Sequence, residues 1–189
     1  MPDEEDPRPG EPAGAHLLFI GLPGSGKSTL GRRLARAVGV PFLDLDTEIE
    51  RIEGRPVAQI FAEDGEAHFR AREHDVTAAL RDRRSMVIAP GGGWAADPRN
   101  PALLRPPGRI IYLRVSPRTA VRRMGLGVQR RPLLAGPDPV AAVQQLLERR
   151  AAVYATADVV VETERRTQRQ ILAALREIAT ELWGPGPAR

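Results

Sequence analysis

Residues 21–28 read Gly-Leu-Pro-Gly-Ser-Gly-Lys-Ser, and this stretch decides the fold class of the chain. It matches the pattern Gly-x-x-x-x-Gly-Lys-[Ser/Thr], which builds a phosphate-binding loop where it joins a buried strand to a helix. Both neighbours are predicted here, because residues 16–21 are a short apolar run and residues 27–38 place apolar side chains on one helical face. In such a loop the backbone N–H groups and the helix dipole face phosphate oxygens, Lys27 reaches the β- and γ-phosphates, and Ser28 binds Mg²⁺.

The use of lysine supports a phosphate site at this loop. Lys27 is the only lysine among 28 basic residues, and all the others are arginines. A compact ammonium group fits inside a phosphate loop, where a planar guanidinium does not. The alternative, a glycine-rich turn that binds nothing, leaves the single lysine unexplained.

The composition indicates one domain and excludes several classes of protein. The 189 residues are 42% hydrophobic and 28% charged, which suits a single packed domain. The absence of cysteine excludes disulfide scaffolds and thiolate metal sites, and three histidines without metal-ligand spacing disfavour a zinc enzyme. No apolar run approaches the roughly 18 residues of a membrane-spanning helix, and no export signal is recognisable. We therefore expect a cytoplasmic protein with no membrane partner.

Arginine is concentrated in one stretch that contains no acidic residue. Residues 99–137 hold nine arginines and neither aspartate nor glutamate. Such a block favours an anionic partner. A nucleic acid and a phosphorylated small molecule both fit this charge, although Tyr112 is the only aromatic residue in the block that could stack on a base. The remaining motifs have to decide between the two.

Short buried strands alternate with helices along the chain. This order predicts an α/β fold with a five-stranded parallel sheet and helices on both faces. The expected strands are residues 16–21, 42–45, 85–89, 109–115 and 158–161. The expected helices are residues 27–38, 47–53, 56–62, 65–83, 117–124, 140–155 and 168–182. A single domain is expected over residues 15–183, with a lid around 125–139 and disordered tails at 1–14 (acidic) and 184–189.

Carboxylates and glycines follow two of the predicted strands. Asp44 and Asp46 close the second strand, and period-two alternation places both carboxylates on one face. Residues 91–93 are three glycines after the third strand, and they permit close approach of the backbone to a ligand. Because ligands of such sheets bind at the carboxyl ends of the strands, we expect these residues beside the phosphate loop. The alternatives are an N-capping role for Asp46 and a flexible turn at the glycines.

Three arginines are candidates for binding a charged ligand. Arg70 is one, although pairing with Glu66 and Glu73 on its own helix is the alternative. Arg131 lies in the expected lid, and such long loops usually cover or bind a ligand. Arg150 lies on the helix that follows, where a solvated face is the alternative.

Taken together, these segments resemble the shikimate kinase family, small P-loop kinases of aromatic amino-acid biosynthesis. The resemblance extends from residue 17 to residue 182 and rests on an ordered series of segments. They are residues 21–29 (GLPGSGKST), 44–50 (DLDTEIE), the block Ile60-Phe61…Gly65-Glu66…Phe69-Arg70…Glu73, residues 91–93 (GGG), 131–134 (RPLL) and Arg150-x-x-x-Tyr154. The resemblance implies a fold of the P-loop nucleoside-triphosphate kinase type. It also implies ATP-dependent phosphorylation of the 3-hydroxyl of shikimate, with Mg²⁺ as cofactor, ATP and shikimate as partners and no nucleic acid.

The resemblance also implies the residues of the site. The implied catalytic residues are Lys27, Asp46 and Arg131. The implied ATP contacts are Gly24, Ser25, Gly26, Lys27, Ser28, Thr29, Arg123, Arg131 and Arg166. The implied shikimate contacts are Asp46, Phe61, Phe69, Arg70, Gly91, Gly92, Gly93 and Arg150, and Mg²⁺ is assigned to Ser28 and Asp44. In this assignment Asp46 orients the hydroxyl and accepts its proton, and Arg70 and Arg150 hold the carboxylate of shikimate.

Trp94 departs from the family pattern, which has a smaller residue after the three glycines. Because it directly follows Gly93, we expect its indole at the mouth of the acceptor crevice, with simple packing as the alternative. Two other functions stay open: a kinase of a related hydroxylated acid such as gluconate, and a non-catalytic nucleotide-binding module. A D-R-x-P-W-L-like segment typical of the first is absent, and the second leaves Asp46, Arg70 and Arg150 unexplained. A monomer is expected.

Overall fold

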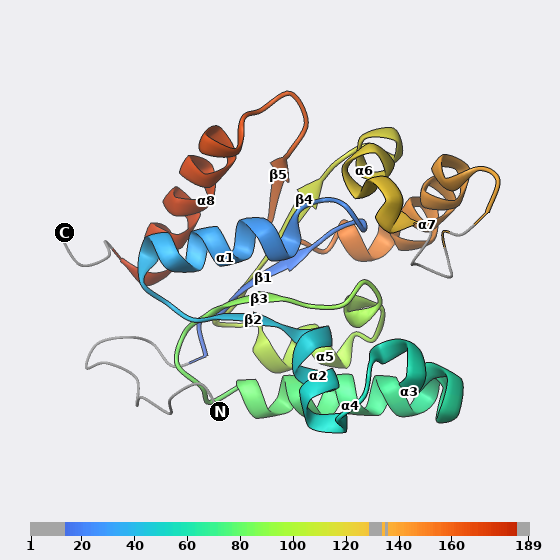
Figure 1. Ribbon diagram of the computed structural model, residues 1–189. Helices are drawn as coiled ribbons and strands as arrows, with labels where there is room; N and C mark the ends of the chain where they lie inside the picture. Colours follow the sequence, from blue (N-terminus) through green and yellow to red (C-terminus); the bar gives the residue numbers. More distant parts are fainter. Residues whose placement is uncertain (1–13, 129–133, 135, 185–189) are drawn as a thin grey trace.

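The computed structural model describes residues 14–128, 134 and 136–184, and they form one β-sheet between two layers of helices (Figure 1). The sheet has five strands in the order β2-β3-β1-β4-β5, and every neighbouring pair is parallel. The strands are β1 (Leu17–Ile20), β2 (Phe42–Asp44), β3 (Val87–Ala89), β4 (Arg109–Arg114) and β5 (Val159–Glu162). The predicted α/β class with a five-stranded parallel sheet is confirmed.

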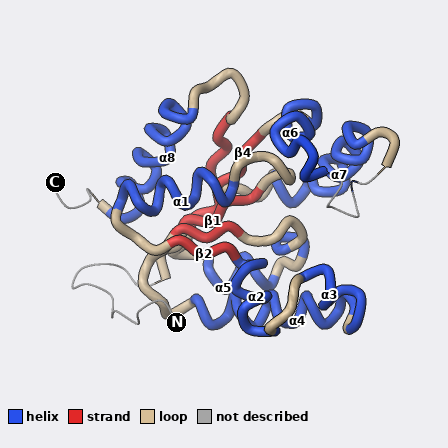
Figure 2. Tube along the Cα trace, in the orientation of Figure 1, coloured by secondary structure: helices blue, strands red, loops and turns tan. Residues whose placement is uncertain are grey.

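Helices lie on both sides of the strands (Figure 2). They are α1 (Lys27–Val38), α2 (Leu45–Glu53), α3 (Val57–Glu63), α4 (Gly65–Leu80), α5 (Arg99–Leu104), α6 (Pro117–Met124), α7 (Pro139–Tyr154) and α8 (Gln168–Trp183), with 3₁₀ turns η1 (Trp94–Ala96) and η2 (Gly125–Val128). None of the helices within the described ranges combines the length and apolarity that a membrane crossing requires. Most of both predicted tails and part of the predicted lid (residues 1–13, 129–133, 135 and 185–189) lie outside the described residues.

Alternate residues of the central strand divide the core into two halves. Leu17 and Phe19 of β1 pack with buried side chains of α1 and α8 on one face of the sheet. Leu18 and Ile20 pack into the other half, with residues of α2, α4 and α7. All four side chains are buried, as expected for a parallel sheet covered on both faces. The strand ends are therefore the places where this sheet meets a ligand.

The strand order places three functional segments side by side. The phosphate loop follows β1, Asp44 ends β2, and Gly91–Gly93 follow β3. Since β3 lies between β2 and β1 and all three strands are parallel, their carboxyl ends lie next to one another. The expected convergence of these segments at one edge of the sheet is confirmed.

The connection after β2 differs from its prediction. The strand ends at Asp44 and α2 begins at Leu45, so Asp46 lies in the first turn of a helix. The predicted strand alternation of Asp44 and Asp46 is therefore wrong, and so is an N-cap role for Asp46, because Asp44 holds that position. The physical reason is that Leu45 and Ile49, four residues apart, bury their side chains on one helical face.

Helix α5 was not predicted from the sequence. It spans Arg99–Leu104 and buries Asn100 and Leu104, which lie on one face at i and i+4. Pro98 and Pro101 flank its start and obscure the periodic pattern, although proline is well tolerated in the first turn of a helix.

Candidate active site

The phosphate loop leads directly into a helix whose N-terminus is open. Gly26 occupies the N-cap position of α1 with φ +98°, a left-handed conformation that favours glycine. Within the described residues no side chain caps this helix by a hydrogen bond, and its first turn contains no acidic residue. The first backbone N–H groups and the positive end of the helix dipole are thus available to an anion. This geometry confirms the predicted strand–loop–helix unit.

Lys27 holds its ammonium group against the same loop. Its Nζ donates hydrogen bonds to the carbonyl oxygens of Gly21 at 2.9 Å and Leu22 at 3.2 Å. The neighbouring Ser25 Oγ is buried and has no hydrogen-bond partner among the described residues. A cation and an unsatisfied hydroxyl therefore lie within one glycine-rich turn, as a bound phosphate chain requires.

Ser28 and Asp44 form a pair of oxygen donors beside the loop. Ser28 Oγ donates to Asp44 Oδ2 at 2.6 Å, which connects the first turn of α1 to the end of β2. Hydroxyl and carboxylate oxygens suit Mg²⁺, which takes few protein ligands and completes its shell with phosphate oxygens and water. The donor set present here therefore fits a magnesium ion that accompanies a nucleotide.

The three glycines after β3 lie against the charged side chains of the acceptor side. A Cβ added to Gly91 would lie 2.4 Å from Asp46 Oδ1, one on Gly92 2.6 Å from Arg150 Nη1, and one on Gly93 2.4 Å from Arg70 Nη2. Real Cβ atoms do not approach heavy atoms so closely, so only glycine fits at these positions while the side chains stay where they are. The structure thus brings together six residues that the sequence analysis assigned to one acceptor: Asp46, Arg70, Gly91, Gly92, Gly93 and Arg150.

Arg70 makes both ion pairs that its spacing permits. Its Nη1 donates to Glu73 Oε2 at 2.7 Å and its Nη2 to Glu66 Oε1 at 3.1 Å. Glu73 is fully buried, whereas Glu66 is exposed. The ion pairs do not displace Arg70 from the site, because its guanidinium also lies against Gly93. The ion pairs are therefore confirmed, and they leave the predicted binding role of Arg70 possible, since one guanidinium can serve both.

Glu73 lies beside Gly91, although the sequence predicts for it only an ion pair with Arg70. Its Oε1 would lie 3.2 Å from a Cβ on Gly91, and this atom has no hydrogen-bond partner among the described residues. Burial raises the pKa of Glu73 above 4.5, although the Arg70 guanidinium acts in the opposite direction. The spacing of Glu73 three residues after Arg70 was the available signal, but only the fold places it beside the glycines.

Asp46 lies between the phosphate side and the acceptor side of the site. Burial and the nearby Asp44 carboxylate raise its pKa above 3.8, while Lys27 and Arg70 act in the opposite direction. A carboxylate with a raised pKa is a stronger base than an ordinary aspartate. The position and the pKa of Asp46 both suit the acceptance of a proton from a hydroxyl group.

Arg150 is held within the site and is not part of a solvated helix face. Its Nη1 is buried beside Gly92 without a hydrogen-bond partner among the described residues, whereas its neighbour Arg149 is exposed. A buried guanidinium N–H left without an acceptor is costly, so the arrangement suits a ligand that brings an anionic group.

Two aromatic rings border the acceptor side. Phe61 and Phe69 have ring centroids 4.8 Å apart, and the Arg70 guanidinium lies over the Phe69 ring at 5.3 Å from its centroid. Phe69 is buried and Phe61 is partly buried. An apolar surface beside the Arg70 guanidinium suits a small ring that carries a carboxylate.

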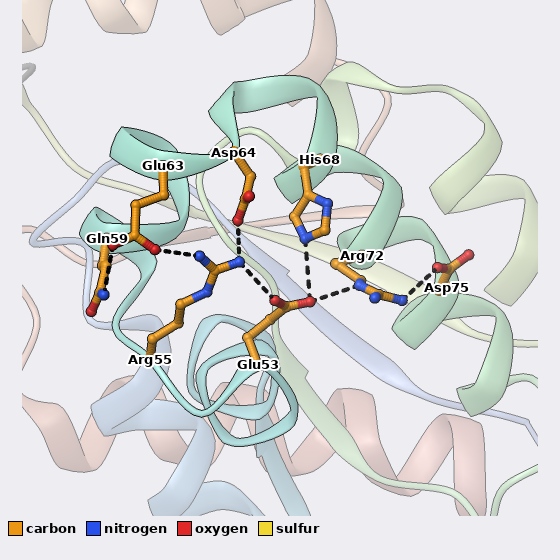
Figure 3. Close-up of polar contacts among 8 residues, drawn as sticks. All are labelled: Glu53, Arg55, Gln59, Glu63, Asp64, His68, Arg72 and Asp75. Atoms are coloured by element: carbon orange, nitrogen blue, oxygen red, sulfur yellow. Dashed lines mark hydrogen bonds and ion pairs between the residues drawn. The ribbon is translucent and has the colours of Figure 1, made fainter.

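A polar network fixes the three helices that carry these acceptor residues (Figure 3). Glu53, the last residue of α2, accepts hydrogen bonds from Arg55 Nη2 at 3.1 Å and from Arg72 Nε at 2.7 Å. Arg55 in turn donates to Glu63 of α3 at 2.6 Å, and Arg72 belongs to α4. The other members of the network are Gln59, Asp64, His68 and Asp75. The network therefore ties α2, α3 and α4 into one unit.

A family model described as shikimate kinase matches residues 23–181 of the chain. The chain belongs to the shikimate kinase family. A shikimate kinase of Mycobacterium avium (strain 104) is 47% identical over 150 residues, which cover 79% of this chain and 84% of that protein. One of Mycobacterium tuberculosis (strain CDC 1551 / Oshkosh) is 44% identical over 172 residues, or 90% of this chain and 95% of that protein.

A solved structure agrees with these relatives. The shikimate kinase from Acinetobacter baumannii in complex with shikimate superimposes with a TM-score of 0.80 at 32% identity, covering 88% of this chain and 93% of that chain. The fold of the present chain is thus of the P-loop kinase type, as predicted, and its activity is that of a shikimate kinase.

Of the remaining residues that the shikimate kinase resemblance assigns to ATP, the structure describes Arg123 and Arg166. Arg123 Nη1 donates to Thr163 Oγ1 at 2.9 Å, so α6 contacts the connection between β5 and α8 that also carries Arg166. Arg166 itself is exposed. Arg131 lies outside the described residues, so its assignment stays a prediction.

Trp94 does not occupy the position expected from its place after the glycines. Its side chain is 1% exposed and belongs to the buried core on the α4 face of the sheet. The expectation of an indole at the mouth of the acceptor crevice is therefore wrong. The backbone turns into η1 at Trp94, which directs the side chain toward the core rather than toward the crevice.

Proposed function

We propose that the chain transfers the γ-phosphoryl group of ATP to the 3-hydroxyl of shikimate, with Mg²⁺ as cofactor. The observation that carries this proposal is the contact of Gly91, Gly92 and Gly93 with Asp46, Arg150 and Arg70, at the edge of the sheet that also bears the phosphate loop. A base, two guanidinium groups and a phosphate loop converge there, and phosphoryl transfer depends mainly on such positioning and charge.

In the proposed reaction Arg70 and Arg150 bind the carboxylate of shikimate, and Phe61 and Phe69 pack against its ring. Asp46 orients the hydroxyl and accepts its proton as the new O–P bond forms. The bond between the γ-phosphorus and its bridging oxygen breaks, and ADP leaves. Lys27 and Arg131 offset the negative charge that develops on the transferred group and the leaving oxygen.

Ser28 and Asp44 would hold the magnesium ion, Ser28 directly and Asp44 from its outer shell. The ion supplies charge neutralisation along the phosphate chain when it is bound. Gly24, Ser25, Gly26 and Thr29 provide the rest of the phosphate loop, and Arg123 and Arg166 flank the adenine. The monomeric state and the cytoplasmic location remain predictions.

A panel of phosphoryl acceptors tests the proposal. ATP consumption is measured with shikimate, gluconate, nucleoside monophosphates and no acceptor, and the product is identified by mass and by ³¹P NMR. We expect turnover above the no-acceptor rate with shikimate alone and a phosphate ester at its 3-hydroxyl. Faster turnover with gluconate or a nucleotide, or a rate independent of any acceptor, would contradict the proposal.

Removal of either guanidinium is expected to weaken acceptor binding selectively. Arg150→Ala and Arg70→Ala should each raise the Kd of shikimate by about 10- to 100-fold, because a charge-assisted pair with the carboxylate is lost, and leave the Kd of ATP within about twofold. Isothermal titration calorimetry measures both constants. Arg149→Ala, which removes an exposed guanidinium from the same helix, is the control and should change neither constant. Unchanged shikimate affinity in both site variants would leave Arg70 and Arg150 with structural roles only.

A further inference from the structure

Trp94 directly follows Gly91–Gly93, and its indole is hydrogen-bonded to α4, the helix that carries Arg70. Its Nε1 donates to Thr77 Oγ1 at 2.8 Å, and both side chains are buried. Thr77 lies on α4, two turns beyond Arg70. The indole N–H therefore connects the end of the glycine segment to the acceptor helix through a hydrogen bond that water does not reach.

The same threonine continues the connection to the acidic partner of Arg70. Thr77 Oγ1 donates to the backbone carbonyl oxygen of Glu73 at 2.6 Å, so one hydroxyl accepts from Trp94 and donates to the turn of α4 that bears Glu73. The Glu73 carboxylate pairs with Arg70 and lies beside Gly91. Trp94, Thr77 and Glu73 thus form a buried chain of hydrogen bonds with ends on the glycine segment and on the acceptor helix.

A second buried group holds the backbone of Trp94. Asn100 Nδ2 donates to the Trp94 carbonyl oxygen at 3.1 Å, and His74 Nδ1 donates to Asn100 Oδ1 at 2.9 Å. Asn100 belongs to α5 and His74 to α4. Trp94 is therefore held by hydrogen bonds of its side chain and of its main chain. The first reaches α4 through Thr77, and the second reaches α4 through Asn100 and His74.

The glycine segment needs such an attachment because it has no side chains of its own. Glycine has the largest backbone freedom of all residues, so three in succession cost the most to hold in one conformation. The backbone of Gly91–Gly93 lies so close to Asp46, Arg70 and Arg150 that no Cβ fits between them. A small displacement of this backbone changes the space between the guanidinium groups and Asp46, and therefore the fit of the acceptor that binds there.

We propose that Trp94 is a positioning residue for the acceptor: through Thr77 it fixes Gly91–Gly93 relative to α4 and thereby sets the affinity for shikimate. This inference rests on the proposed function of the site. The N–H edge of the Trp94 indole makes the hydrogen bond to Thr77, and the rest of the ring system fills the core beneath the glycine segment.

Three substitutions separate attachment from packing. Trp94→Phe keeps an aromatic ring but removes the N–H donor. Thr77→Val keeps the shape of the threonine but removes the hydroxyl, and Thr77→Ser keeps the hydroxyl. We expect Trp94→Phe and Thr77→Val each to raise the KM of shikimate by about 5- to 20-fold, as the loss of one buried hydrogen bond implies, with kcat and the KM of ATP within about twofold. Thr77→Ser should restore the shikimate KM to within about threefold of the parent chain, because its hydroxyl makes the same two bonds.

Trp183→Phe is the matched control for the indole substitution. Trp183 is the only other tryptophan, and its Nε1 donates to the backbone carbonyl oxygen of Ala15, away from the glycine segment. This variant loses the same kind of hydrogen bond and should keep all three kinetic constants of the parent chain. Circular dichroism melting curves show that each variant is folded at the assay temperature.

The double variant Trp94→Phe/Thr77→Val completes the test. If one hydrogen bond links the two residues, the double variant should raise the shikimate KM no further than Thr77→Val does. Suppose that the parent chain phosphorylates shikimate, and that the variants have a lower Tm but the same shikimate KM as the parent chain. This result would overturn the inference, and Trp94 would then have only a packing role in the core. A parent chain that does not turn over shikimate would instead refute the proposed function. Should Trp94→Phe not fold, the contrast between Thr77→Val and Thr77→Ser decides the question in the same way.

Discussion

Lys27→Ala is expected to lower kcat for shikimate phosphorylation by about 10²- to 10³-fold, the usual loss when one preorganised charge at the transferring group is removed. The Lys27 ammonium lies against the phosphate loop, where it donates hydrogen bonds to the carbonyl oxygens of Gly21 and Leu22. A phosphate chain in the loop offers a stronger, charged partner to the same group. No other lysine in the sequence can replace it.

The measurement is the initial rate of ADP formation at saturating ATP and shikimate, with thermal unfolding of each variant recorded alongside. Arg36→Ala, in the last turn of the same helix, is the control for the removal of a cation from α1 and should retain the parent rate. Lys27→Arg keeps the charge but places a planar group in the loop, so it should recover only part of the rate. A folded Lys27→Ala variant that keeps more than about a tenth of the parent rate would contradict the role of the phosphate loop.

The phosphate side of this site was predictable because consecutive residues specify it. The glycine pattern, the apolar strand before it and the amphipathic helix after it are all local features, and α1 spans the predicted residues 27–38. Asp44 also lies where expected, because the carboxyl ends of parallel strands meet at one edge of the sheet.

The acceptor side depends on contacts between distant segments, which a local pattern does not encode. The two-residue spacing of Asp44 and Asp46 fits a strand, whereas burial of Leu45 and Ile49 makes the segment helical. The neighbouring Gly93 predicts a place for Trp94 at the crevice, whereas its side chain lies in the core. Its true partner, Thr77, lies 17 residues earlier on α4. Tertiary packing decides such positions, and the resemblance to a family gives no help where this chain departs from the pattern.

Asp46→Asn is expected to lower kcat by about 10²- to 10⁴-fold, the contribution typical of a positioned proton acceptor. The amide keeps the shape of the carboxylate and still accepts a hydrogen bond from the hydroxyl, so the shikimate KM should change by less than about threefold. The split between kcat and KM distinguishes a base from a group that only binds the acceptor. Glu48→Gln, a conversion of carboxylate to amide on the same helix at a residue paired with Arg51 on the surface, is the control and should leave kcat unchanged.

The pH dependence of kcat/KM tests the role of Asp46 independently. The base acts when it is deprotonated, so the rate of the parent chain should fall as the pH drops through the pKa of Asp46. Because burial and Asp44 raise the pKa of Asp46 above 3.8 in the free protein, the acidic limb of kcat/KM, which reports the free enzyme, should lie above pH 3.8. In Asp46→Asn the limb that belongs to this carboxylate disappears from the residual rate. A variant that keeps the full kcat of the parent chain together with an unchanged acidic limb would show that another group accepts the proton.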